Sequence, residues 1–352
     1  MTTDEQYMFR CLELATKAAG YVAPNPMVGA VLVYKDRIIG EGFHKAFGGP
    51  HAEVNCLSSV KESDKPLISS STLYVSLEPC SHHGKTPPCA DLIIRERIPE
   101  VVVGCRDPFP QVNGSGIEKL ISSGISVKQG VLENEAVSLN KRFFTFHRHH
   151  RPYIILKWAQ TADGKISGRG KERVSISNDI TNKLVHQWRS EEAAILVGTE
   201  TALLDNPALI NRMAGAKQPI RLVIDRNLRL SETLNIFNDS SQTIIFNTIR
   251  EERRDNIYYC KLGDEKDLVP GMLKKLYSLQ IQSVLVEGGK TLHESFLQSG
   301  NWDEVRRIIS LEKNLPEGYP APELPGISLD HSDQFLTDRI DYFQHPGYLK
   351  AD

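Results

Sequence analysis

The sequence lacks the marks of a membrane, secreted or nucleic-acid-binding protein. In its 352 residues no apolar run approaches the roughly 20 residues that are needed to span a bilayer. The opening stretch MTTDEQYMFRCLEL has no basic segment followed by an apolar one, so no signal peptide is expected. Lys and Arg number 42 against 44 Asp and Glu, which argues against a surface for nucleic acid or another polyanion. We therefore expect a cytoplasmic protein whose partners are small molecules.

Cysteine is scarce as well. Six cysteines in a chain of this length do not form a disulfide framework, and in a reducing cytosol clustered cysteines are more often metal ligands. Four of the six lie in apolar periodic runs and are expected to be core residues: Cys11, Cys56, Cys105 and Cys260. The remaining two, Cys80 and Cys89, have eight residues between them and are the candidates for a metal.

The length predicts two domains, and the order of helices and strands agrees. After a helix and a β-hairpin, the strands at 72–77, 100–105 and 125–130 alternate with helical patterns. This alternation predicts a three-layer α/β/α domain over residues 1–146. The polar, basic stretch 147–152 ends in Pro152 and is predicted to be a linker. A second alternation begins at Tyr153 and predicts another α/β domain over residues 153–352.

A histidine and an acidic residue precede the two candidate cysteines. His51 and Glu53 stand at the start of a predicted helix, Cys80 follows Pro79 at a strand end, and Cys89 opens the next helix. One imidazole and two thiolates match a catalytic zinc, whose fourth position is left to water. Zinc lowers the pKa of water from about 15.7 to about 7. Glu53 is close enough to His51 to move the proton without binding the metal.

Two other interpretations of these residues compete with a catalytic zinc. Taken singly, His51 is readily explained as a core histidine, and the cysteines as small buried apolar residues. A zinc-stabilised scaffold without catalytic activity would call for a fourth Cys or His ligand, and it gives no reason for an acid at position 53. The ordered set of four residues favours the catalytic site.

The second half of the chain contains no G-x-G-x-x-G after a strand, so it has no common dinucleotide fingerprint. It does contain VLVEGGKTLHESF (residues 284–296), in which a predicted strand leads through Gly288 and Gly289 into a helix. Backbone amides at such a helix start can hold a phosphate. By itself the pattern is weak, because most strand–Gly–helix joints only turn the chain.

The order H-x-E, P-C and C resembles that of the zinc nucleobase deaminases, but eight residues separate the cysteines where P-C-x-x-C is usual. PCSHHGKTPPC, PNPMVGAVLV, GEGFH and RDPFPQVNGSGIEKL are similar to the deaminase half of the bifunctional riboflavin-biosynthesis deaminase/reductases. LKWAQTADGKIS, HQWRSEEAAILVGTETALLDNPALINR and RLVIDRNLRL resemble the reductase half of the same family. The resemblance runs from about Tyr7 to Glu304 and implies a cytidine-deaminase-like domain followed by a dihydrofolate-reductase-like domain.

The resemblance implies a role for each residue of the first site. One zinc per chain is bound by His51, Cys80 and Cys89, and Glu53 is the proton shuttle. The implied substrate contacts are Asn25, His44, Lys85 and Asp107. The implied reaction replaces the C2 amine of 2,5-diamino-6-ribosylamino-4(3H)-pyrimidinone 5′-phosphate by oxygen.

For the second site the resemblance implies NADPH as the hydride donor and reduction of the ribosyl group to ribityl. The implied cofactor contacts are Ala159, Thr201, Asp205, Gly289, Lys290, Thr291, Leu292, His293, Glu294 and Ser295. The implied substrate contacts are Arg189, Leu209, Arg212 and Glu287, and the two arginines suit a 5′-phosphate. Lys157 is expected to face the same region. The family also implies a homo-oligomer.

Several positions depart from the family pattern. Phe109 stands where the family often has Asn, Arg173 and Ser175 replace the usual Ser and Trp, and Asn206 replaces the second Asp of Asp-Asp-Pro. The tail EGYPAPELPGISLDH does not show the expected closing strands.

Two questions of specificity stay open in the sequence. Arg226 is a candidate for the 2′-phosphate of NADPH, against the alternative of a solvent-facing arginine. A rival assignment, a cytidine or tRNA deaminase with a binding module attached, is disfavoured by the balanced charge and by the missing P-C-x-x-C.

Overall fold

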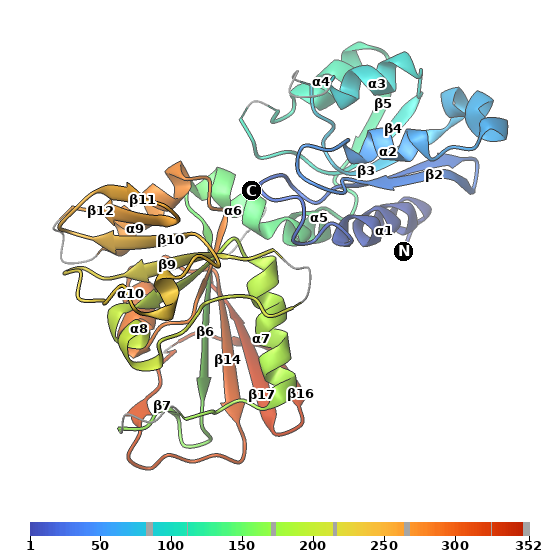
Figure 1. The fold of residues 1–352 in the computed structure, drawn as a ribbon. Coiled ribbons are helices and arrows are strands. Elements are labelled where there is room, and N and C mark those ends of the chain that lie inside the picture. Colours follow the sequence, from blue (N-terminus) through green and yellow to red (C-terminus); the bar gives the residue numbers. More distant parts are fainter. Residues whose placement is uncertain are drawn as a thin grey trace. The chain divides into compact units, whose positions relative to one another are not determined.

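The computed structural model describes residues 1–81, 87–110, 112–169, 174–213, 217–263, 268–324 and 326–347. It contains two compact units, one covering Met1–His149 and the other beginning at His150, each with its own sheet (Figure 1). Within these ranges, no helix has both the length and the apolar character needed to cross a membrane. Both units combine helices with a mixed sheet that contains parallel strand pairs, so the predicted α/β class is confirmed.

The first unit contains a five-stranded sheet in the order β2-β1-β3-β4-β5, in which β1 is antiparallel to β2 and β3 and the other pairs are parallel. Its elements in chain order are α1 (Thr3–Thr16), β1 (Gly29–Tyr34), β2 (Arg37–Phe43), α2 (Ala52–Ser58), the 3₁₀ helix η1 (Glu62–Ser70), β3 (Thr72–Leu77), α3 (Cys89–Arg95), β4 (Glu100–Cys105), α4 (Ser115–Ser122), β5 (Ser126–Gln129), α5 (Glu133–Leu139) and α6 (Lys141–His149).

Alternation of side chains along the strands builds the three layers of this unit. Val31 and Val33 of β1 face α1 and pack with Met8, whereas Ala30 and Leu32 face the opposite side. That second face is covered by α2, α3 and α4 (Figure 1). Successive side chains of a strand point to opposite faces of the sheet. Because both faces are buried here, the strands are almost continuously apolar in the sequence.

The strand directions gather the predicted site residues at one edge of this sheet. Because β1 is antiparallel to β3, the start of β1 lies beside the end of β3, and β2 ends there too, with Phe43 opposite Gly29. β4 runs parallel to β3 and ends at the same edge. The segments that carry Asn25, His44, Cys80 and Asp107 therefore meet at this edge.

The second unit holds a ten-stranded sheet in the order β11-β12-β10-β9-β8-β13-β6-β14-β17-β16. Its elements are β6 (Tyr153–Gln160), β7 (Lys165–Ser167), α7 (Asp179–Glu191), β8 (Ala194–Gly198), α8 (Thr199–Asp205), β9 (Ile220–Ile224), η2 (Asn235–Phe237), β10 (Thr243–Asn247), β11 (Glu252–Arg254), β12 (Ile257–Lys261), α9 (Val269–Ser278), β13 (Ser283–Val286), α10 (Lys290–Ser299), β14 (Glu304–Ser310), β15 (Tyr319–Pro320), β16 (Leu329–Phe335) and β17 (Asp338–Gln344).

Helices cover both faces of this sheet as well. Ile154 and Leu156 of β6 pack with Met272 of α9 and Phe296 of α10, whereas Tyr153 and Ile155 share a cluster with residues of α7. The strands β9, β8, β13 and β6 are mutually parallel. Their carboxyl ends form one edge, and the Gly288-Gly289 turn that follows β13 lies there.

Two sequence-based expectations need correction. Residues 147–149 were predicted as linker, but they complete α6, because the His147 ring packs against Phe109, Phe143 and Phe146 with ring centroids 4.5 to 5.3 Å apart. Closing strands were not expected from the tail, yet β16 and β17 form an antiparallel hairpin on β14. The hairpin begins at Leu329, and β16 is almost wholly exposed, so it lacks the alternation that identifies a strand.

Candidate active sites

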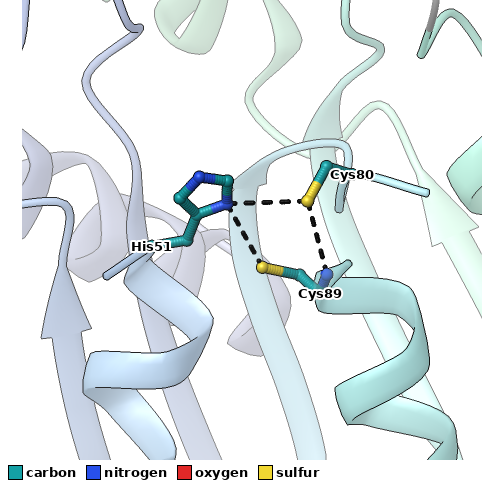
Figure 2. Close-up of side chains that lie close together, drawn as sticks. All are labelled: His51, Cys80 and Cys89. Carbon is teal, nitrogen blue, oxygen red and sulfur yellow. Dashed lines mark hydrogen bonds between the residues drawn. The ribbon is translucent and has the colours of Figure 1, made fainter. Parts of the chain in front are cut away.

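His51, Cys80 and Cys89 converge at the carboxyl edge of the first sheet (Figure 2). His51 is the N-cap residue of α2, Cys80 follows β3, and Cys89 is the first residue of α3. The Nδ1 atom of His51 lies 3.5 Å from the Cys80 Sγ and 3.3 Å from the Cys89 Sγ. Within the described ranges, these three residues are the group that could hold a metal ion.

The geometry of this group fits zinc. Zn–S bonds of about 2.3 Å and a Zn–N bond of about 2.0 Å at tetrahedral angles place sulfur and nitrogen about 3.5 Å apart, which matches the distances found. The backbone N–H of Cys89 donates to the Cys80 Sγ at 3.3 Å. Hydrogen bonds from Cys89 and His51 hold the pKa of the Cys80 thiol well below its ordinary value, so a thiolate forms readily.

Glu53 lies in the first turn of α2, two residues after the ligand histidine, and it is 3% exposed. Burial, together with negative charge at Cys80, raises the pKa of Glu53 to about 7. A buried carboxyl group beside the ligand set, with a pKa near neutrality, can both accept and donate a proton at physiological pH.

Asn25 and His44 are joined next to the metal ligands. The His44 Nδ1 donates to the Pro50 carbonyl at 2.9 Å, because a carbonyl oxygen can only accept. Burial lowers the pKa of His44, so its Nε2 is unprotonated and accepts from the Asn25 Nδ2 at 3.1 Å. The His44 ring meets His51 edge-on, with centroids 5.5 Å apart. This pairing leaves the Asn25 side-chain oxygen as the acceptor available to a ligand.

Asp107 follows β4 at the same edge and is 8% exposed. Burial raises the pKa of its carboxyl group to about 7, against the N–H of Phe109, which donates to its Oδ1 at 2.8 Å. Phe109, at the position that departs from the family, packs its ring on His147. Lys85 lies outside the described residues.

Asn140 is a residue of this region that the sequence did not indicate. Its side chain accepts from the Met27 N–H and donates to the Met27 carbonyl, both at 2.8 Å. It thereby fixes the segment that carries Asn25. The two partners lie 113 residues apart and match no sequence motif, so only the fold reveals the pair.

In the second unit, Glu287 joins Arg189 and Lys157 in an ion network whose side chains are 7%, 18% and 12% exposed. The Nε and Nη2 atoms of Arg189 each donate to the Glu287 carboxylate at 2.7 Å, and the Lys157 Nζ donates at 3.1 Å. Burial alone would raise the pKa of Glu287, but the charges of Lys157 and Arg189 outweigh it and hold that pKa far below its usual range. The guanidinium fork of Arg189 thus binds Glu287. This differs from the expectation that Arg189 binds the 5′-phosphate of the substrate.

A cavity of about 240 Å³ opens beside this network. Its lining includes Arg189, Leu209 and Arg212 from the predicted substrate set, together with Asn206 and Asn235. The Asn206 Oδ1 accepts from the Asn235 N–H at 2.7 Å, a contact that an aspartate could also make. The Leu209 side chain is buried in the core, so this residue can offer only its backbone to a ligand. Arg212 is exposed, and the structure shows no ion-pair partner for it in the described parts of the chain.

The predicted cofactor residues lie on α10 and α8 and near the end of β6. Gly289 is the N-cap of α10 and provides no side-chain cap, so the Lys290 and Thr291 amides are available to an anion, whereas the Leu292 N–H donates to the Gly289 carbonyl at 3.1 Å. A Cβ atom on Gly289 would lie 3.5 Å from the Thr201 Oγ1 of α8, which places these two residues side by side. Ala159 is near the end of β6, and Asp205 ends α8 as an exposed residue.

Side chains further along α10 face in several directions. Lys290 and Glu294 form an ion pair of 3.5 Å on the surface, and the Ser295 Oγ donates to the Thr291 carbonyl. His293 is fully buried, with its ring nitrogens against the carbonyl oxygens of Gly289, Lys157 and Val286, while Leu292 packs against the core. A cofactor at this helix start would therefore meet backbone amides rather than the His293 ring.

Two further positions of interest are placed by the structure. Arg226 follows β9, at the carboxyl edge that it shares with β8 and β13, and is half-buried. The carbonyl of Ser175 accepts from the Lys313 Nζ at 2.7 Å. Arg173 lies outside the described residues.

Two family models match the chain, one within each unit of the fold. Residues 1–105 match the family model of the cytidine and deoxycytidylate deaminase zinc-binding region, and residues 152–310 match that of the RibD C-terminal domain. The riboflavin biosynthesis protein RibD of Aquifex aeolicus is 40% identical over 96% of this chain and 95% of its own length. That of Escherichia coli is 37% identical over 96% of both.

Solved structures agree over the whole length. The chain is similar to a diaminohydroxyphosphoribosylaminopyrimidine deaminase/5-amino-6-(5-phosphoribosylamino)uracil reductase of Thermotoga maritima, with 37% identity, a TM-score of 0.88 and coverage of 97% and 99% of the two chains. Acinetobacter baumannii RibD is 30% identical with a TM-score of 0.88, over 97% and 98%. The chain belongs to the RibD family of bifunctional riboflavin-biosynthesis enzymes, in which a zinc-binding deaminase domain precedes an NADPH-dependent reductase domain.

Proposed function

We propose that the first unit deaminates the phosphorylated diaminopyrimidinone for which the Thermotoga relative is named, and that the second unit then reduces its ribosyl group. The observation that carries the proposal is the convergence of His51, Cys80 and Cys89 on one point, with the buried acid Glu53 beside them. Three donors and an adjacent carboxyl group suit hydrolytic catalysis rather than a structural metal.

Each residue of the first site has a role in this proposal. His51, Cys80 and Cys89 would hold zinc, which would supply a Lewis acid that lowers the pKa of water so that hydroxide is available at neutral pH. Glu53 takes the proton of that water and returns it to the departing amine, for which its buried position and raised pKa are suited. His51 is the N-cap residue of the helix that carries Glu53, so the ligand and the acid stand two residues apart at one helix start.

The substrate is oriented by groups at the rim of the site. The Asn25 side-chain oxygen accepts from an N–H of the pyrimidine, because its amide nitrogen is already bonded to His44. Asp107, with its carboxyl group buried nearby, takes a second polar group of the ring. Lys85 meets the phosphate as a point charge.

In the second unit, bound NADPH would supply the hydride for reduction of the ribosyl group. The free amides at the start of α10, together with Gly289 and Thr201, hold the cofactor. Arg212 binds the substrate 5′-phosphate in the cavity. Arg189 contributes a positive field there, while its fork remains on Glu287, and Glu287 in turn orients the Lys157 ammonium.

The wider setting is also part of the proposal. All six cysteines are free, which supports a reducing, cytoplasmic location. The family resemblance supports a homo-oligomer acting on small phosphorylated pyrimidines. Analytical ultracentrifugation at micromolar concentration would show a mass above that of the single 39.5 kDa chain; a monomer under those conditions would contradict the oligomer.

One assay tests both halves. The purified protein is incubated with the diaminopyrimidinone phosphate and NADPH, while ammonia release and loss of the nicotinamide absorbance are followed together. We expect one ammonia per NADPH oxidised, and ammonia alone when NADPH is omitted. Absence of ammonia with zinc bound would overturn the deaminase assignment, and ammonia without NADPH oxidation would overturn the reductase assignment.

A further inference from the structure

Glu78, directly before Pro79 and Cys80, has a buried carboxylate that accepts four backbone N–H groups. Its Oε2 accepts from Asp107 at 3.2 Å and from Gly114 at 2.9 Å. Its Oε1 accepts from Gly116 at 3.0 Å and from Ile117 at 3.3 Å. The residue is 4% exposed. Such a carboxylate is well satisfied by donors, and it joins three separate stretches of chain.

Helix α4 depends on this carboxylate for its N-terminal cap. The N-cap residue is Gly114, which has a φ of +92° and no side chain with which to cap the helix. The first-turn amides of Gly116 and Ile117 would otherwise lack acceptors. The Glu78 Oε1, from another part of the chain, accepts from both amides, and its negative charge interacts favourably with the positive end of the helix dipole.

Two glycines allow the close approach that this cap requires. A Cβ atom on Gly116 would lie 1.9 Å from the Pro79 carbonyl oxygen, and one on Gly114 would lie 2.1 Å from the Arg106 Nη2. A side chain at Gly116 would force the helix away from the Pro79 backbone, whereas at Gly114 the flexible end of Arg106 could move and the φ of +92° is what favours glycine. The segment GSG at residues 114–116 therefore follows from the docking of α4 on Glu78.

The residues on both sides of the metal ligand Cys80 take part in these hydrogen bonds. Cys80 lies between Glu78 and Ser81, and the Ser81 hydroxyl bonds to that of Ser115, the first residue of α4, at 2.6 Å. On the other side, Glu78 holds the backbone of Asp107. One hydrogen-bonded cluster thus joins the end of β3 that carries Cys80, the start of α4 and the segment that carries Asp107.

We propose that Glu78 is a positioning residue for deamination. Its carboxylate holds the backbone of Asp107 at a fixed distance from the metal ligand Cys80. It acts through the backbone and touches neither substrate nor metal. The inference rests on the proposed role of Asp107 as a substrate contact.

The test is Glu78→Gln, which keeps the shape but turns an NH₂ group toward two of the four donors. The Michaelis constant for the pyrimidine substrate should rise about tenfold or more, with a smaller change in kcat, because Asp107 is displaced. The absorption spectrum of the cobalt-substituted protein should stay unchanged, since the three ligands remain. Amide exchange at Asp107, Gly116 and Ile117 should speed up about tenfold.

Glu118→Gln is the matched control. It removes one negative charge from the first turn of the same helix, but its side chain is exposed. We expect it to leave the Michaelis constant and the amide exchange unchanged. An unchanged Michaelis constant or unchanged exchange in Glu78→Gln would overturn the inference.

Asp107→Asn separates the inference from the proposed function. If that variant alone leaves the Michaelis constant unchanged, the proposed substrate contact is wrong. If it raises the constant, the double variant should be no worse than Asp107→Asn within about threefold, and multiplied losses would contradict a role of Glu78 through Asp107.

A measurement on the unaltered protein covers the case in which Glu78→Gln does not fold. The amides of Gly116 and Ile117 should exchange about tenfold more slowly than that of Thr291, which lies in the first turn of α10, where no side chain caps the helix. Equal exchange rates would overturn the inference without any substitution.

Discussion

Two buried glutamates, one in each unit, are driven in opposite directions by their neighbours. Glu53 lies beside thiol ligands, and burial with nearby negative charge raises its pKa to about 7. The Glu287 side chain is 7% exposed, but despite this burial Lys157 and Arg189 hold its pKa far below the usual range. Burial favours the neutral acid in both cases, so the local charges decide the outcome. The comparison distinguishes an acid that can exchange protons from one that stays ionised and organises cations.

The largest expected effect comes from removing the proton-exchanging acid. Glu53→Gln should lower the rate of deamination by about 10²- to 10⁴-fold, because the variant cannot move a proton. Zinc content, measured by metal analysis, should stay at one per chain, since His51, Cys80 and Cys89 are intact. NADPH oxidation with pre-deaminated substrate is the internal control and should be unchanged. Deamination at the normal rate would refute the role of Glu53.

Glu287, the glutamate that stays ionised, should contribute to the stability of the second unit. Glu287→Gln should lower the free energy of unfolding of the second unit by about 3–5 kcal/mol, because two buried cations lose their counter-charge. All three tryptophans, Trp158, Trp188 and Trp302, lie in that unit, so their fluorescence during urea unfolding reports on it alone.

Glu294→Gln is the control for this variant. It breaks the surface pair with Lys290 and should cost less than about 0.5 kcal/mol. A loss in Glu287→Gln as small as that of the control would contradict a buried ionic network.

His293 extends the comparison to a buried base. Burial lowers its pKa to about 4, against about 6.5 in an unfolded chain. Its contribution to stability is therefore complete above about pH 6.5 and is lost as the pH falls toward 4, by about 3 kcal/mol in all. Tryptophan-monitored unfolding between pH 7 and 4 should show this loss, and His293→Gln should flatten it. His331→Gln, on the exposed strand β16, should leave the profile unchanged, and an unchanged profile in His293→Gln would refute the assignment.

The smallest expected effect concerns cofactor choice. If Arg226 binds the 2′-phosphate of NADPH, Arg226→Ala should raise the Michaelis constant for NADPH by about 10- to 150-fold and leave that for NADH nearly unchanged. Arg229→Ala, which removes an exposed arginine paired with Glu200, is the matched control. An unchanged preference would leave the phosphate to backbone amides or to Lys290.

The sequence predicts the zinc site more completely than the reductase site. The zinc ligands lie within 39 residues and carry their spacing in the chain, so the sequence alone identifies His51, Cys80 and Cys89. The four remaining cysteines are buried, as expected. α5, α6 and the hairpin of β16 and β17 were missed, because their apolar periodicity is short or masked by charged residues.

The sequence by itself determined which groups are present, the α/β class and the points at which strands lead into helices, because periodicity and local motifs encode them. Only the tertiary structure decided what those groups do to one another. Arg189 meets Glu287 across 98 residues, and Glu78 holds amides up to 39 residues away. These partners lie on different elements, so their contact depends on strand order and helix docking, which no local pattern contains. The charge of a buried acid is set by such contacts, and its chemistry is therefore a property of the fold.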